Sequence, residues 1–297
     1  MDSIYQIATQ GAKWSFIPTA FEHPFMLRGL ISALIVGPML GSIGSLIIAK
    51  RMVFFSQTIS HASLTGVALG LLLGEAPGET YGGLYGFTLL VALLMLYVRN
   101  RTRTAPDTIV GVVLAQTLGL GVVSLVMVTK QFNVHQVEAI LFGSLITITE
   151  KDIFVLMLSA LLCGTVLVLI YNHSMLIGLN PVIAKAQGIN TVFLEYPFVA
   201  VITVVIVASL KIIGALLVLA LIVIPSAAAQ NIFNNLLGFF WCSVIFATTS
   251  AVGGLVLSAI YTIPIGAAIV LIASILFYLS LILRVLMTHV SIQQGSL

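Results

Sequence analysis

The chain has 297 residues, of which 60% are apolar and only 7% are charged, and its mean hydropathy is +1.20. Because a soluble globular domain carries about 25% charged residues, this composition excludes a soluble domain and predicts an all-α, polytopic membrane protein. The net charge of +3 is too small and too dispersed for nucleic-acid binding. The expected partners are therefore lipid, a transported solute and other protein subunits.

The N-terminal residues 1–24 are mixed and weakly amphipathic, which predicts an interfacial arm on the bilayer and no cleavable signal peptide. A membrane domain is expected over residues 25–287, followed by a C-terminal tail over 288–297. Its first span, Phe25–Ala49, carries small residues three or four apart, a spacing that lets helix backbones approach closely. These residues are Gly37, Gly41 and Gly44.

A cluster of polar side chains opens the next apolar segment, which ends near Leu73. Hydroxyl side chains from Ser56 to Thr65 surround Gln57 and His61. Hydrocarbon has no water to satisfy such groups, so they must face protein or a water-filled cavity. An ionisable residue inside a membrane is a functional-site candidate by default, so His61 is the first residue to consider for contact with a transported solute.

The other spans are separated by turns and short charged clusters. We expect them at Tyr81–Val98, Thr108–Val128, Ile153–Tyr171, two segments of Tyr196–Gln230, Leu236–Ile260 and Ala267–Val285. The run Tyr196–Gln230 is longer than the ~20 residues that a bilayer needs, so a break near Lys211 is expected. The total is eight or nine spans.

The charges orient these spans. Three arginines fall within residues 99–103, the strongest positive-inside signal in the chain, which places this loop in the cytoplasm. Counting spans from it puts the N-terminus outside and the C-terminus inside. Such an arrangement needs an odd number of spans, so nine is preferred to eight.

A short helix is expected in the cytoplasmic segment at residues 180–189. Asn180 is a good N-cap, Pro181 suits the first helical position, and Gly188 suits the left-handed residue after the helix. Two turns are not stable alone in water. The helix must therefore dock, either on its own protein as an ordinary loop helix or on a partner.

Four blocks, in order, resemble the membrane permease of a metal-uptake ABC transporter, of the zinc, manganese and iron family related in architecture to the vitamin B12 permease. They are the segments 50–52 with 58–68, 141–145, 214–228 and 261–270. Together they cover roughly residues 25–285. The His-Ala-Ser-Leu-x-Gly-Val-Ala form of the first block is closer to zinc permeases than to manganese ones.

The resemblance implies that residues 180–189 are the coupling helix that sits in a groove of an ATPase subunit. Its residues would include Asn180, Pro181, Ala184, Lys185 and Gly188. The implied assembly has two permeases, two cytoplasmic ATP-binding subunits and an extracytoplasmic metal-binding protein at a prokaryotic plasma membrane. The chain has no GxxxxGK[ST] phosphate loop. We therefore expect a transporter subunit that is not itself an enzyme, with a divalent metal as substrate and no permanently bound cofactor.

The resemblance also implies a metal site in the permeation path, formed by a histidine and by an aspartate four residues before it. The histidine corresponds to His61, but the aspartate position holds Gln57, whose neutral amide cannot offset desolvation of a divalent cation. Ser60, Ser56 or Thr58 could add weak oxygen ligands, and a second copy of the chain could face the first across the path. The alternative is a structural His61, hydrogen-bonded to the backbone.

Weaker candidates lie on the outer side. His135 and Glu138 share one helical face at a spacing that suits a metal, while Glu75 and Glu79 could receive the loaded binding protein; a solvated loop or turn is the simpler explanation of each pair. Two other functions stay open at this point. An ATP-independent secondary carrier of a small solute fits the composition, whereas a membrane-embedded hydrolase lacks an evident catalytic pair.

Overall fold

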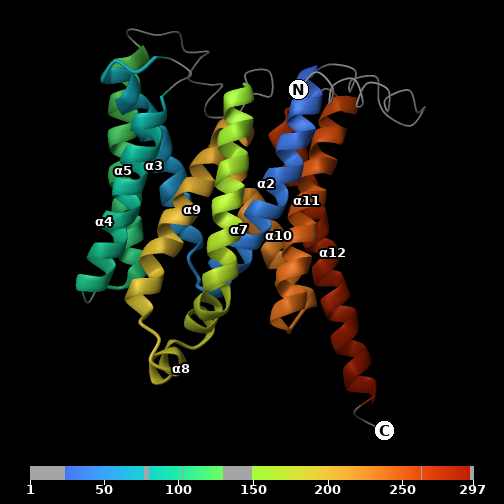
Figure 1. The fold of residues 1–297 in the computed structure, drawn as a ribbon. Coiled ribbons are helices and arrows are strands. Elements are labelled where there is room, and N and C mark those ends of the chain that lie inside the picture. The colour runs from blue at the N-terminus through green and yellow to red at the C-terminus, as the bar shows by residue number, and fades with distance from the viewer. Residues whose placement is uncertain (1–23, 77–79, 103, 130–148, 262, 295–297) are drawn as a thin grey trace.

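The computed structural model describes residues 24–76, 80–102, 104–129, 149–261 and 263–294 (Figure 1). These ranges contain helices and no strand. The interfacial arm predicted at the N-terminus lies outside them, except that its last residue, Pro24, already begins a helix.

The helices are arranged as a single bundle (Figure 1). Their bounds are α2 Pro24–Ala49, α3 Val53–Leu72, η2 Gly82–Phe87, α4 Thr88–Arg101, α5 Pro106–Thr129, α7 Glu150–Leu179, α8 Pro181–Ala186, α9 Thr191–Ile213, α10 Ala215–Ile232, α11 Leu236–Tyr261 and α12 Ile265–Gln294. The η2 segment is a π-helix that continues directly into α4.

Seven segments of the described chain are long and apolar enough to cross a membrane, namely α2, η2 with α4, α5, α7, α9, α11 and α12. The α10 helix is apolar but shorter, and α3 has the length but carries the polar cluster. The described residues thus hold seven spans by length and composition, and the nine preferred from the sequence are reached only if α3 and α10 are counted as well. An odd number fits the positions of α2 and α12, because α2 begins and α12 ends at opposite ends of the bundle (Figure 1).

Two helices continue beyond the spans predicted for them. The α7 helix runs to Leu179 instead of Tyr171, and α12 runs to Gln294 instead of Val285. The tail predicted from residue 288 therefore begins as a continuation of α12. No proline or glycine follows either predicted end closely enough to stop the helix there.

The break predicted near Lys211 falls three residues later, at Gly214. This glycine has φ +94° and separates α9 from α10. Only glycine adopts such a backbone conformation without steric penalty, so the glycine fixes where the helix ends and the lysine does not.

Helix α2 packs against α11, α10 and α7, and buries Leu40, Ile43 and Leu46 completely. The close approach predicted from its glycines is confirmed. A Cβ at Gly41 would lie 2.8 Å from Val244 Cα on α11, and one at Gly44 would overlap the Ile222 carbonyl oxygen on α10. These backbones therefore touch with no room for a side chain.

Replacing Gly44 with alanine is expected to destabilise the protein by about 1–3 kcal/mol, because the new methyl group must push α10 away from α2. Gly119→Ala on α5 is the matched control, since none of the described residues has an atom within 4 Å of its Cβ position. Alanine is also the better helix former there. Melting temperatures in detergent should fall for Gly44→Ala and hold or rise for Gly119→Ala; equal melting temperatures would contradict the contact.

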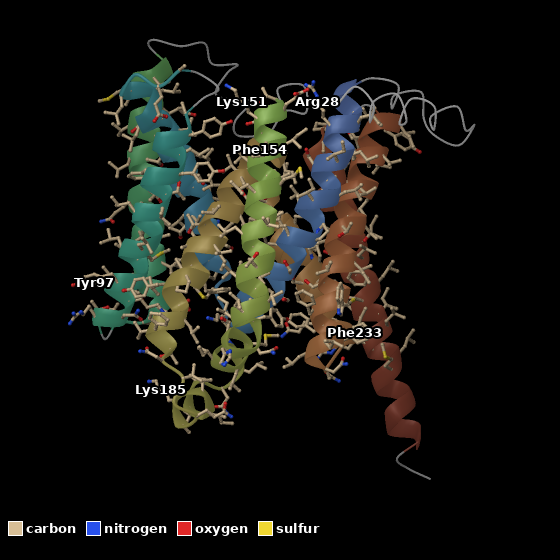
Figure 2. All side chains as sticks on the ribbon, in the orientation of Figure 1. Arg28, Tyr97, Lys151, Phe154, Lys185 and Phe233 are labelled. Atoms are coloured by element: carbon tan, nitrogen blue, oxygen red, sulfur yellow. The ribbon has the colours of Figure 1, made fainter. Side chains whose placement is uncertain are left out.

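The two ends of the bundle differ in the residues they carry. Arg28 and Lys151 lie at one end, and Tyr97, Lys185 and Phe233 lie at the other (Figure 2). The positive-inside rule predicts that the Lys185 end is the cytoplasmic one. We call that end the inner end and the opposite one the outer end.

Candidate translocation site and coupling helix

The polar cluster predicted from the sequence lies on α3, where most of its hydroxyl groups are buried and paired. Ser56, Thr58, Ser60 and Ser63 are at most 3% exposed. Each donates to a carbonyl oxygen three or four residues earlier in the helix, at 2.7–3.1 Å. These bonds satisfy the hydroxyls within the helix itself, which explains how α3 carries them through an apolar bundle.

Gln57 and His61 lie on a different, partly exposed face of α3. Their spacing puts them one helical turn apart, and Leu64 continues the same face. Within the described part of the chain, neither the amide nor the imidazole has a hydrogen-bond partner. A structural histidine would need such a partner, so this geometry favours a His61 that is free to bind a solute.

Ser60, which the sequence offered as a third ligand, faces away from this pair. It is 3% exposed, and its Oγ donates to the Ser56 carbonyl oxygen at 3.1 Å. Its hydroxyl would reach a metal beside His61 only if α3 rotated and that bond broke. The candidate site in this structure is therefore Gln57 with His61.

Helix α5 fixes the orientation of α3. The Thr65 hydroxyl donates across the interface to the Thr117 carbonyl oxygen at 2.8 Å, and a Cβ at Gly121 would lie 2.7 Å from the Thr65 oxygen. Because Thr65 is one turn beyond His61, this close contact holds the helix that carries the imidazole.

At the outer end, Glu75 is turned toward its own chain. Its Oε1 accepts a hydrogen bond from the Gly83 amide at 3.0 Å, and the carboxylate packs over Gly70 and Gly82. This interaction ties the end of α3 to the start of η2. The carboxylate thus has a local role, whether or not the turn also receives a binding protein.

The other outer candidates, Glu79, His135 and Glu138, lie outside the described residues. Among the residues that are described, no group of three or more His, Cys, Asp and Glu side chains could hold a metal ion. His61 and Gln57 of one chain therefore do not form a complete coordination sphere with other described side chains.

The short helix α8 has the capping residues predicted for its two ends. The Asn180 side chain accepts from the Ile183 amide at 3.2 Å, Pro181 opens the helix, and Gly188 has φ +75°. Ala184 is fully buried against the bundle, while Lys185 points outward. The α8 helix thus docks on its own protein through one side and leaves the other side open.

The open side of α8 and the start of α9 are apolar. Val182 is 75% exposed, Ile183 46% and Phe193 75%. Helix α8 lies at the inner end, beyond the ends of α7 and α9, and Phe193 belongs to the first turn of α9 (Figure 1). Exposed apolar residues grouped in this way mark an interaction surface, consistent with a partner beneath α8.

The sequence does not predict a group of residues near α8 that we call the inner hub: the charged Lys50, Arg99 and Glu195, the aromatic Phe198, and Gly178, which packs against Lys50. The Lys50 Nζ atom is buried, lies 4.2 Å from the centre of the Phe198 ring and has no hydrogen-bond partner in the part of the chain that the structure describes. Arg99 and Glu195 form an ion pair at 3.9 Å. The hub connects the α2–α3 turn with α4, α7 and α9.

Burial lowers the pKa of Lys50 from 10.5 to about 8, against the attraction of Glu195, and Arg99 lowers it further. The unfolded lysine therefore binds a proton more strongly than the folded one. The free energy of unfolding should consequently rise with pH between about 8 and 10.5, by up to roughly 3 kcal/mol.

Melting temperatures of the detergent-solubilised wild type and of Lys50→Met, measured at about pH 7 and about pH 9.5, test this linkage. The difference in melting temperature between the two proteins reports on Lys50 alone, because all other titrating groups are the same in both. The melting temperature of the wild type should rise relative to that of Lys50→Met as the pH rises. A difference independent of pH would show that the lysine keeps its ordinary pKa in the fold.

The comparisons with known proteins identify the family. A model of the ABC 3 transport family matches residues 22–284. The chain belongs to the ABC 3 transport family. One relative of this ABC 3 chain is the manganese transport system membrane protein MntC of Listeria monocytogenes, 30% identical over 89% of this chain and 92% of that protein.

A zinc transporter subunit and a solved structure are similar to this ABC 3 chain over nearly their full lengths. The high-affinity zinc uptake system membrane protein ZnuB of Haemophilus influenzae is 29% identical over 88% of this chain and 97% of that protein. PsaBC from Streptococcus pneumoniae, solved in complex with Fab, is 26% identical with a TM-score of 0.76. That match covers 94% of this chain and 95% of the solved chain.

Sequence reasoning missed the inner hub of this ABC 3 chain because its members are distant in sequence and ordinary one by one. Lys50 enters the sequence analysis only as the first residue of the block 50–52 in the family resemblance, and Glu195 and Phe198 do not enter it at all. A buried Lys–aromatic contact leaves no local motif. One signal could have indicated the hub: Lys50 and Glu195 carry opposite charges, and both lie at the predicted cytoplasmic ends of their spans.

Proposed function

We propose that this chain is the permease subunit of an ATP-driven importer for divalent metal ions. A separate cytoplasmic subunit would hydrolyse ATP, and an extracytoplasmic protein would deliver the metal. The observation that carries the proposal is His61: a partly exposed imidazole, without a hydrogen-bond partner among the described residues, on a helix inside an ABC 3 family bundle.

The chemistry of the site favours zinc over manganese, with iron a further candidate. Imidazole nitrogen suits zinc, whereas manganese prefers carboxylate, carbonyl and water oxygens. The Gln57 amide adds one neutral oxygen beside His61. Relatives of the chain are named for both manganese and zinc. Which metal is transported would therefore depend on both the site in the permease and the protein that delivers the metal.

Two copies of the chain would complete the coordination. One chain offers a single imidazole and one amide on the exposed face of α3, fewer ligands than any divalent metal takes. A homodimer with the two α3 faces opposed would supply two imidazoles and two amide oxygens. Water could fill the remaining positions during passage.

In this proposal, α8 is the helix that transmits closure of the ATPases to the membrane-spanning helices. Its capped ends and its buried Ala184 make a rigid lever, and its exposed Val182 and Ile183 offer the apolar contact for an ATPase groove. The proposed setting is a prokaryotic plasma membrane, with α2 starting outside and α12 ending in the cytoplasm. Closure of the ATPases would then push α8 toward the membrane.

Replacing Gln57 with aspartate is expected to preserve metal uptake and to lower the metal concentration at half-maximal rate by about tenfold. A carboxylate at this position offsets the desolvation of the cation, which the amide cannot do. Gln57→Leu, of similar size without a ligand atom, is the matched control and should raise that concentration. An aspartate variant that transports like the leucine variant would remove Gln57 from the site.

Uptake in cells tests the function as a whole. Cells that lack their own zinc and manganese importers would express the chain with its ATPase and binding protein, and accumulation of labelled zinc, manganese and iron would be measured in competition. We expect saturable uptake of zinc, manganese or both. Saturable uptake of none of these metals, with the complex present in the membrane, would overturn the proposal.

A further inference from the structure

The proposed coupling helix α8 connects α7 with α9, and both of these helices contact Lys50. The α7 helix ends just before α8, and a Cβ at Gly178 in its last turn would lie 3.0 Å from Lys50 Cγ and 3.1 Å from the Ala49 carbonyl. The α9 helix starts just after α8 and places the Phe198 ring 4.2 Å from Lys50 Nζ. Lys50 thus lies between the two supports of α8.

The same lysine belongs to the turn that leads into α3. The Met52 amide donates to the Ile47 carbonyl oxygen at 2.9 Å, and the Arg51 amide donates to that of Ile48 at 3.1 Å. This is the Schellman arrangement, and Arg51 takes its left-handed position with φ +55°. Only three residues separate α2 from α3, and these bonds leave them little freedom.

We propose that Lys50 is the positioning residue that carries movement of the α7–α8–α9 segment to α3, the helix with Gln57 and His61. A push on α8 displaces the ends of α7 and α9. Because Gly178 and Phe198 contact Lys50 from opposite helices, their displacement moves the α2–α3 turn. The stiff turn passes that movement to the first turn of α3 and on to the candidate site.

A purely structural role fits Lys50 poorly. Its ammonium nitrogen is buried and has no hydrogen bond to any described residue, and the charge of Arg99 repels the same group. Burying a cation in this way opposes folding. An apolar side chain of similar length would fill the space without that penalty, so the charge has to be explained by function, as a contact with the Phe198 ring and an attraction to the charge of Glu195 that hold while the helices move.

This inference depends on the proposed function, and the test is designed to separate the two. The full transporter, with its ATPase and binding protein, would be reconstituted in liposomes as wild type, Lys50→Met and Lys50→Arg. The control is Lys151→Met at the outer end, far from the inner hub (Figure 2). Labelled zinc or manganese taken up is measured per ATP hydrolysed, together with the melting temperature of each variant.

We expect Lys50→Met to hydrolyse ATP at a rate within about threefold of the wild type while the metal moved per ATP falls at least about tenfold. Its melting temperature should be unchanged or higher at neutral pH, because a buried charge has been removed. Lys50→Arg keeps the charge and the contact with the ring and should restore most of the coupling. Lys151→Met should behave like the wild type.

Two results would overturn the inference. One is normal metal uptake per ATP in Lys50→Met; the other is a joint loss of ATP hydrolysis, uptake and thermal stability, which would make Lys50 a structural residue. Both leave the proposed function standing if the wild type transports metal. If the wild type itself moves no metal in the presence of ATP, the proposed function fails, independently of Lys50.

Discussion

Replacing His61 with alanine is expected to reduce ATP-dependent zinc or manganese uptake by at least roughly a hundredfold at equal membrane expression. Loss of a residue that only supports a ligand already weakens a metal site 10–100-fold, and here the ligand itself is removed. The imidazole is the only group of the Gln57–His61 pair that binds a divalent metal strongly. Its removal leaves a neutral amide on the accessible face of α3.

Ser63→Ala is the matched control for His61→Ala. Ser63 lies on the same helix, is fully buried, and its hydroxyl donates to the Ile59 carbonyl oxygen at 2.7 Å. Its loss removes a hydrogen bond internal to the helix and no group on the accessible face. The serine variant should therefore transport, and uptake by the alanine variant of His61 at the wild-type rate would remove His61 from the path.

A charge on the exposed side of α8 is expected to disconnect the permease from its ATPase. Val182→Glu puts a carboxylate on a residue that is 75% exposed in this chain. Its own fold should not change, but an apolar groove that closed over the carboxylate would bury an unpaired charge, which is costly. The affinity of the ATPase for the permease should fall at least about tenfold, and uptake should fall with it.

Co-purification of the ATPase with the Val182→Glu permease, and ATP-driven uptake in liposomes, measure this effect. Thr102→Glu is the control, because it adds the same charge at an exposed position of the inner end, outside α8. It should retain the ATPase. If Val182→Glu also retains the ATPase and transports normally, the partner surface lies elsewhere and α8 is an ordinary loop helix.

Local sequence signals predicted most of the fold. Apolar length gave the spans, the spacing of Gly41 and Gly44 gave the tight contact of α2 with α10 and α11, and Asn180 and Gly188 gave the ends of α8. Each of these depends on the chemistry of a few neighbouring residues. The arginine cluster at residues 99–103 predicted an odd number of spans, which agrees with the opposite ends of the bundle at which α2 begins and α12 ends (Figure 1).

What the sequence did not predict depends on which face a side chain presents and on long-range contacts. The hydroxyl of Ser60 looked like a ligand beside His61, yet adjacent residues on a helix point about 100° apart, and Ser60 faces inward. The end of α9 depends on the backbone of Gly214, whose φ value the apolar run around it does not indicate. The inner hub needs α2, α4, α7 and α9 to be in place before Lys50 and Glu195 approach each other.

The central claim is that this chain moves a divalent metal only when a partner hydrolyses ATP. The most direct measurement is uptake of labelled zinc and manganese into liposomes that contain the permease alone or the permease with its ATPase, with the metal-loaded binding protein outside and ATP accessible to the ATPase. We predict uptake with the ATPase and ATP, and none with the permease alone or with ATP omitted. Metal or solute uptake by the permease alone, driven by an ion gradient, would contradict the claim and identify a secondary carrier.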